Sequence, residues 1–212
     1  TMMGVLSGLE IACWDIVGKS ANKPIYELIG GRIHEKLRSY TYLYPVDKNG
    51  QHNYEDPGLG AECAIEYKEK GFTAIKFDPA GPYSAYSGHQ ISLNRLEHSE
   101  NYCRKIREAV GDSCDILIGT HGQMTPSSAI RLAKRLEQFD PLWFEEPVPP
   151  GQSSAMAEVA KKTSIPIATG ERLTSKYEFY DILKNNSASI IQMNLGRVGG
   201  ILEAKKIASL AE

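Results

Sequence analysis

The sequence carries almost no net charge. Its 24 Lys and Arg residues nearly balance its 26 Asp and Glu residues, and the formal net charge is −2 at pH 7. Proteins that bind nucleic acid or an anionic membrane through general electrostatics carry a clear excess of positive charge. No apolar run approaches the roughly 20 residues that a membrane span needs, and the first residues lack the charged start of a signal peptide. We therefore expect no nucleic-acid partner and no membrane association.

Cysteine is also scarce, and its spacing carries no motif. The four cysteines, Cys13, Cys63, Cys103 and Cys114, include no C-x-x-C pair and mostly lie in apolar stripes. Cysteines in such positions are usually reduced and packed in a core, rather than joined in a disulfide framework. The sequence therefore predicts four reduced core cysteines and a cytoplasmic location.

Two short apolar runs, 142–148 and 165–172, each end near a carboxylate, at Glu145 and Glu171. A continuous apolar run of this length is typical of a parallel strand that is buried on both faces. A carboxylate at the end of such a strand needs a partner for its charge, and a divalent cation is a common one. Glu145 and Glu146 are adjacent and face opposite sides of a strand, so only one of them can reach such a cation. We expect Glu145 and Glu171 to lie on neighbouring strands and to share one divalent cation.

Strands and helices are expected to alternate along the chain. A helical apolar pattern follows each strand, and a separate helix is expected over residues 1–22, stopping near Gly18. This alternation predicts a parallel α/β sheet, either open and doubly wound or closed as a (β/α)8 barrel. No G-x-G-x-x-G follows the first strand, and polar residues recur where strands end, so the barrel is favoured. The expected strands are 38–44, 72–77, 115–119, 142–146, 165–169 and 189–193.

The predicted barrel is partial. A complete barrel of this type needs about 250 residues and eight strand–helix units, whereas only six units are visible in this sequence. We assign residues 1–36 to the end of a capping domain and its connector helix, and residues 37–212 to a partial (β/α) barrel. Strands seven and eight are not in this sequence, and an open edge of this kind would favour pairing with another chain.

Five motifs resemble the mandelate racemase and muconate lactonizing group of the enolase superfamily. They are residues 7–31, Gly71–Lys76, Trp143–Pro147, Ala168–Arg172 and Arg197–Gly200, in that order. The resemblance covers nearly the whole chain and implies a TIM-type barrel of the enolase superfamily. It also implies an enzyme that uses Mg²⁺, with Mn²⁺ as a substitute, to remove a proton α to a carboxylate and to stabilise the enediolate that forms.

The resemblance assigns roles to individual residues and shows departures. Glu145 and Glu171 match the second and third metal ligands of the family, whereas the first ligand, an aspartate, is replaced by Gly119. His121 stands two residues after it and is expected to act as the third ligand or as an acid–base catalyst. On the second strand, Lys76 and Asp78 replace the family's K-x-K pair. Lys76 is expected to polarise the substrate or simply to pair with a carboxylate, and Asp78 is expected to be the base, a ligand or an ordinary turn residue.

The departures favour the sugar-acid dehydratase and cycloisomerase branches of the family over the racemases. Tyr83 and His89, in the long segment after the second strand, and Arg172 are the expected substrate-binding residues. Three alternatives remain open: a racemase or epimerase, a Schiff-base aldolase with Lys76 as nucleophile, and a non-catalytic relative. The expected partners are a small acid-sugar substrate and further copies of the same chain in a homo-oligomer. Isolated histidines such as His52 and His98 are expected to be exposed.

Overall fold

The computed structural model describes residues 2–81 and 90–212. Within them, six strands alternate with helices, which confirms the predicted parallel α/β class. The strand at residues 115–119 is observed at its expected bounds, and the other five are shorter than expected, because only part of each apolar run pairs with a neighbour. The strands are β1 (Thr41–Tyr42), β2 (Ala74–Phe77), β3 (Asp115–Gly119), β4 (Trp143–Glu145), β5 (Ile167–Thr169) and β6 (Ile190–Ile191).

The strands form one sheet in chain order, β1-β2-β3-β4-β5-β6, and the registered pairs from β1 to β5 are all parallel. Register places Gly119 at the end of β3 opposite Glu145 at the end of β4. Glu145 in turn pairs with Ala168 of β5. The carboxyl ends of parallel strands meet at one edge, so polar residues that are far apart in sequence gather there.

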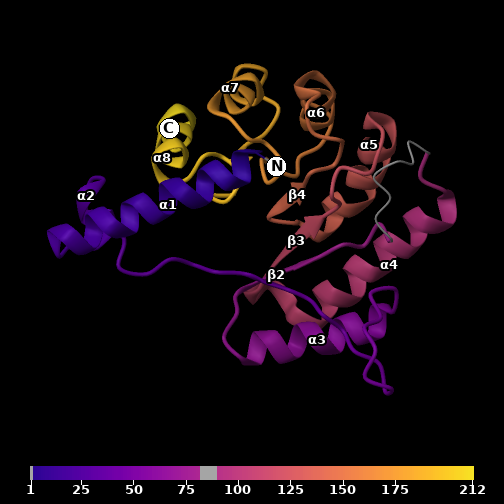
Figure 1. Cartoon of the computed structure of the whole chain (residues 1–212). Helices are drawn as coiled ribbons and strands as arrows, with labels where there is room; N and C mark the ends of the chain where they lie inside the picture. The colour runs from indigo at the N-terminus through magenta and orange to yellow at the C-terminus, as the bar shows by residue number, and fades with distance from the viewer. Residues whose placement is uncertain (1, 82–89) are drawn as a thin grey trace. The chain divides into compact units, whose positions relative to one another are not determined.

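The chain divides into two compact units. The larger unit, residues 39–169 and 185–190, holds most of the sheet and a core that includes Ile75, Ile106, Ile116, Leu132 and Phe144. Its helices α3 (Pro57–Glu69) and α4 (Leu93–Val110) pack side by side, as Figure 1 shows, and α5 (Pro126–Leu136) follows them in the chain. Asp56, Ser92 and Thr125 cap α3, α4 and α5 with side-chain oxygens, and Pro126 stands in the first turn of α5 as expected. The helices of this unit are α3 (Pro57–Glu69), α4 (Leu93–Val110), α5 (Pro126–Leu136) and α6 (Ser153–Ala160), with short 3₁₀ turns at Gly111–Ser113 and Glu137–Phe139.

The smaller unit comprises residues 1–38, 170–184 and 191–212. Its helices are α1 (Met2–Ala21), α2 (Ile25–Leu28), α7 (Lys176–Lys184) and α8 (Ile201–Ala211). The carboxylate of Glu10 on α1 accepts hydrogen bonds from the backbone N–H groups of Ile201 and Leu202, at 2.7 and 3.0 Å. A side chain from α1 thus caps the first turn of α8, where backbone donors have no partner within the helix.

The same contact explains one of the motifs quoted from the sequence. Gly200 has a φ of +93°, and a Cβ added there would overlap the Glu10 carboxylate. The neighbouring Gly199 donates its N–H to the hydroxyl of Ser7 at 2.9 Å. The glycines of the Arg197–Gly200 turn therefore allow the Ser7 and Glu10 side chains of α1 to approach the backbone closely.

The expectation that the first helix stops near Gly18 is wrong. The helix passes through Gly18, where an added Cβ would lie 3.0 Å from the carbonyl oxygen of Lys23, and it continues to Ala21. Asn22 then adopts a left-handed φ of 52°, and the Lys23 N–H bonds the Gly18 carbonyl. Asn22, not Gly18, therefore ends the helix. Gly18 has no side chain, so the backbone of Lys23 can pass close to it.

The cysteine prediction is correct in one respect and wrong in another. All four cysteines are free, and Cys103 and Cys114 are buried. Cys63 is half-buried and packs against the core, whereas Cys13 is exposed and is not a core residue. Among the helices of residues 2–81 and 90–212, none combines the length and apolar character that crossing a membrane requires.

Candidate active site

A cavity of about 470 Å³ lies within the larger unit, where β2 and β3 end. Its lining combines an acid–base pair with aromatic rings, an arrangement typical of small-molecule sites. Asp78 follows β2, His121 follows β3, and both face the cavity. The other lining residues are Tyr42, His52, Asn53, Tyr54, Glu55 and Gly81.

Asp78 and His121 form a pair, although they are 43 residues apart in sequence. Nδ1 of His121 lies 3.2 Å from Oδ2 of Asp78, and the Ala80 N–H donates to Oδ1 of Asp78 at 2.9 Å. The Asp78 side chain is 10% exposed and the His121 side chain 40% exposed. Burial raises the pKa of the Asp78 carboxyl above its ordinary value, although the His121 and Ala80 hydrogen bonds act in the opposite direction. The buried carboxyl and the partly exposed imidazole are thus within reach of each other for the exchange of a proton.

His121 adopts an uncommon backbone conformation. Its φ is +54°, in the left-handed region that residues other than glycine seldom occupy, and Glu146 has a φ of +48° just after β4. Thr120 links the two turns, because its hydroxyl donates to the carbonyl oxygens of Glu145 and Glu146, both at 3.0 Å. Backbone strain of this kind concentrates at functional sites, where the surrounding contacts hold it in place.

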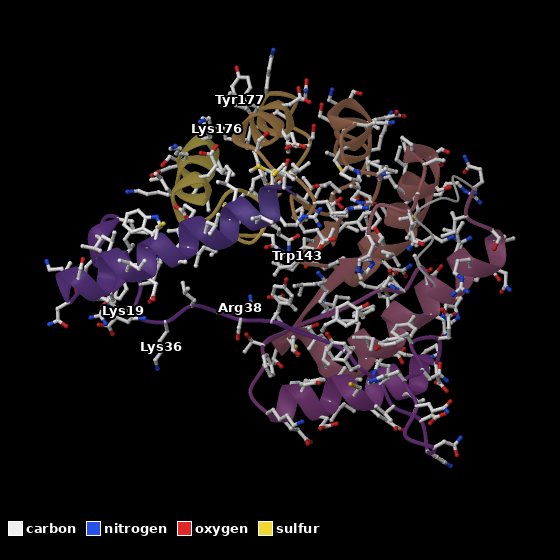
Figure 2. The ribbon with its side chains drawn as sticks, in the orientation of Figure 1. Lys19, Lys36, Arg38, Trp143, Lys176 and Tyr177 are labelled. Atoms are coloured by element: carbon white, nitrogen blue, oxygen red, sulfur yellow. The ribbon has the colours of Figure 1, made fainter. Side chains whose placement is uncertain are left out.

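Glu145 is buried in a polar cluster with Lys76 and Trp143. The Lys76 ammonium lies 2.5 Å from Oε1 of Glu145, and the Trp143 indole N–H donates to Oε2 at 3.0 Å. Lys76 also stands 5.7 Å from the ring centre of Tyr40, and Tyr40 packs edge-on against Trp143. Trp143, labelled in Figure 2, lies among the strands of the larger unit. Of the roles considered for Lys76, the structure realises the contact with a carboxylate.

Gly119 provides the space that Lys76 occupies. A Cβ added to Gly119 would lie 3.2 Å from Cε of Lys76 and 3.9 Å from its Cγ and Cδ. The lysine stem therefore runs along the bare backbone of β3 before its ammonium reaches Glu145. Gly119, which stands where the family has its aspartate ligand, therefore leaves room for the Lys76 ammonium to pair with Glu145 on β4.

Glu146 turns away from Glu145, as expected for adjacent residues. Its Oε1 accepts a hydrogen bond from the hydroxyl of Thr169 at 2.6 Å, and the residue is buried. Thr169 ends β5, so the contact joins the ends of two neighbouring strands. Glu146 is therefore placed to support the sheet edge, whereas Glu145 faces Lys76.

The remaining predicted residues lie elsewhere in the chain. Glu171 and Arg172 follow β5 in the smaller unit, and both are half-buried. Gly170, with a φ of +137°, precedes them and packs against Phe179 and the backbone of Gln192, so any side chain there would collide with both. Tyr83 and His89 lie outside the residues that the structure describes.

In the observed arrangement, the Lys76 ammonium holds an oxygen of Glu145 that a divalent cation would otherwise contact. Both oxygens of Glu145 are already engaged, and His121 faces Asp78. Residues 2–81 and 90–212 contain no group of three or more His, Cys, Asp or Glu side chains that could hold a metal ion. A cation at Glu145 would have to displace the Lys76 ammonium, because two positive charges cannot share one buried carboxylate oxygen at low cost.

The aromatic side of the cavity was not predicted from the sequence. Tyr42, His52, Tyr54 and Glu55 line it, and His52 is exposed as expected, whereas His98 is half-buried. Burial, with a contribution from the charge of Asp78, raises the pKa of Tyr42 well above its ordinary value, so its hydroxyl stays neutral. The only signal in the sequence is the density of tyrosine between residues 40 and 54, which predicts aromatic packing but no particular site.

Comparison with known proteins identifies the family. The family described as "Enolase C-terminal domain-like" matches residues 58–212. A crystal structure of a mandelate racemase/muconate lactonizing enzyme-type protein from Burkholderia SAR-1 is 71% identical, with a TM-score of 0.98 over 100% of this chain and 52% of its own. A protein of the same description from Labrenzia alexandrii DFL-11 is 63% identical, with a TM-score of 0.93 over 99% of this chain and 53% of its own.

Relatives with described activities are more distant. D-xylonate dehydratase of Haloferax volcanii is 34% identical over 100% of this chain and 51% of its own length. D-gluconate dehydratase of Thermoproteus tenax is 35% identical over 98% of this chain and 40% of its own length. The chain thus spans about half the length, or less, of the curated relatives it matches. The predicted partial barrel is confirmed, and the chain belongs to the mandelate racemase/muconate lactonizing enzyme group of the enolase superfamily.

Proposed function

We propose that this chain forms part of a sugar-acid dehydratase. The enzyme removes the proton α to the substrate carboxylate, expels the β-hydroxyl as water, and yields a 2-keto-3-deoxy acid after the enol takes up a proton. The observation that carries the proposal is the Asp78–His121 pair at the cavity, with its two groups 3.2 Å apart. The described activities of the relatives support the same reaction.

The chemistry divides between two groups with different environments. Asp78 is the more buried group and has the raised pKa, so it is suited to hold a proton and to take one from carbon. His121 is more exposed and is suited to protonate the departing hydroxyl and to exchange protons with solvent. Tyr42, neutral and at the same cavity, can donate a hydrogen bond to a substrate oxygen.

The superfamily typically uses a divalent metal, which stabilises negative charge that develops on the substrate carboxylate. Glu145 and Glu171 remain the proposed ligands, with Mg²⁺ as the ion and Mn²⁺ as its substitute. His121 as the third ligand is the alternative to its role as the acid. Lys76 competes with such an ion for Glu145 in the observed arrangement. Arg172, Tyr83 and His89 remain proposed substrate contacts, and the homo-oligomer and the cytoplasmic location remain predictions.

Incubation of the full chain with Mg²⁺ and D-xylonate, D-gluconate or D-galactonate tests the reaction. Mass spectrometry is expected to detect the loss of one water, and a carbonyl reagent is expected to trap the keto acid. A product of unchanged mass would instead identify a cycloisomerase or an epimerase. If borohydride traps substrate on Lys76, the aldolase alternative is correct.

The metal is tested separately from the reaction. Calorimetric titration with Mg²⁺ is expected to show one saturable site that is lost in Glu171→Gln and retained in Glu158→Gln, which removes an exposed charge on α6. A chelator is expected to abolish dehydration. If Mg²⁺ shows no saturable site and dehydration continues in the chelator, the proposed ligand set is wrong.

A further inference from the structure

One side of the cavity is formed by a hairpin that no predicted role uses. Residues 45–53 fold back through an antiparallel bridge between Val46 and His52 and through a hydrogen bond from the Asn53 N–H to the Pro45 carbonyl. The Asp47 carboxylate accepts from the backbone N–H groups of Asn49 and Gln51, at 2.8 and 2.9 Å, and thereby closes the turn. The hairpin is therefore held by its own hydrogen bonds before any ligand binds.

The hairpin and the residue that follows it present two stacked rings to the cavity. His52 and Tyr54 lie with their centroids 5.7 Å apart and their planes at 21°, and both rings line the cavity. Tyr44 supports His52 from the side, with centroids 6.2 Å apart. We call His52 and Tyr54 the aromatic wall. Flat rings with polar edges suit a molecule that has an apolar C–H face and hydroxyl groups at its rim.

An ion pair fixes the wall to the rest of the unit. Glu55, next to Tyr54, accepts a hydrogen bond from Arg95 of α4 at 2.6 Å, and His98 of α4 lies 3.7 Å from the same oxygen. The guanidinium of Arg95 also packs over Gly81, where an added Cβ would lie only 2.5 Å from Nη1. Arg95 thus holds two segments that line the cavity, one after β1 and one after β2.

We propose that the aromatic wall binds the hydroxyl-bearing carbon chain of the sugar acid and determines which sugar acids are accepted, with Arg95 as its positioning residue. The proposal rests on the proposed function. Asp78 and His121 mark the side of the cavity where the proton moves, and the aromatic wall contributes to the lining of the same cavity. The rings contact C–H groups, and the imidazole and phenol edges exchange hydrogen bonds with hydroxyls.

Steady-state kinetics of the full chain across sugar acids of five and six carbons test the proposal. His52→Ala and Tyr54→Ala are expected to raise KM by about five- to tenfold, to change kcat by less than about twofold, and to alter the order of preference among the acids. Arg95→Met is expected to act in the same direction, and Arg95→Lys to restore part of the loss. Tyr177→Ala is the matched control, because Tyr177 is exposed on α7 (Figure 2) and should leave both constants unchanged.

The outcomes separate this proposal from the proposed function. If the parent chain dehydrates a sugar acid and the wall variants keep the same KM values and the same preference, the aromatic wall is not a specificity surface. If the parent chain dehydrates none of the acids, the proposed function fails, and binding of D-gluconate is measured by saturation-transfer NMR. Signals that His52→Ala removes and Tyr177→Ala keeps would support the wall, whereas no signal in the parent chain would overturn it.

Discussion

Lys76 and Glu145, 69 positions apart in sequence, form an ion pair across the sheet, with Nζ 2.5 Å from Oε1. Their side chains are only 12% and 6% exposed. Gly119, on the strand between them, has no side chain, so the lysine stem runs close to its backbone. A buried carboxylate is costly without a partner of opposite charge, so Lys76 neutralises what would otherwise be an unpaired charge in the interior.

Lys76→Met is expected to destabilise the fold by about 3 kcal/mol, because it leaves Glu145 buried with only the Trp143 hydrogen bond. Urea unfolding followed by circular dichroism measures the change. The double variant Lys76→Met/Glu145→Leu is expected to recover most of this loss, since it removes both charges together. If the single and double variants are equally destabilised, the ion pair is not the source of the effect.

Gly119→Ala and Gly200→Ala are expected to reduce the free energy of unfolding by very different amounts. Gly119 does not have a positive φ, and the nearest atom to its added Cβ belongs to the flexible end of Lys76, so the cost should be less than about 1 kcal/mol. Gly200 combines a φ of +93° with overlap of the Glu10 carboxylate that caps α8, so the cost should be about 2–3 kcal/mol. Thermal unfolding of the two variants side by side checks the order, and an equal cost would contradict it.

Asp78→Asn and His121→Asn are each expected to lower kcat for dehydration by at least about 100-fold, because each removes one of the two proton-transfer groups. The fold should tolerate both changes, since asparagine preserves hydrogen bonding at each position. Single-turnover measurements with the preferred sugar acid provide the readout. Glu137→Gln, a charge change between α5 and β4 and outside the cavity lining, is the control and should retain full activity.

The Glu137 carboxylate is expected to make the stability of the fold depend on pH. The Ser164 N–H, at 2.9 Å, and the Lys134 ammonium, at 3.0 Å, lower the pKa of the Glu137 carboxyl below its ordinary value, against the opposing effect of partial burial. The folded state therefore releases the Glu137 proton more readily than the unfolded state does. The resulting stabilisation of the fold is complete at pH values above the unfolded pKa, and it disappears as the pH falls through the folded pKa.

Glu137→Gln should consequently cost at most about 1 kcal/mol at pH 7, because solvent screens a partly exposed pair. The difference from the parent chain should vanish at the acidic end of a series of urea unfolding curves recorded at falling pH. A difference that stays constant over the whole series would mean that the carboxylate charge is not responsible.

The sequence by itself determined the order of strands and helices and the family. Parallel strands that are covered on both faces must be apolar, and helices between them must carry one apolar stripe, so the alternation is visible in the residues. Asp115–Gly119 was predicted at its observed bounds for this reason. The positions of Asp78, His121 and Glu145 at strand ends followed from the same pattern.

Only the tertiary structure decided which of these residues meet. Whether Glu145 faces Lys76 depends on the register of three strands, which cannot be read from local patterns. The aromatic wall depends on a hairpin whose turn is closed by Asp47 and whose neighbour Glu55 is anchored by Arg95, 40 positions further along the chain. Contacts of this kind arise from packing between distant segments, which is why His52 looked like an ordinary surface residue until the fold placed it beside the cavity.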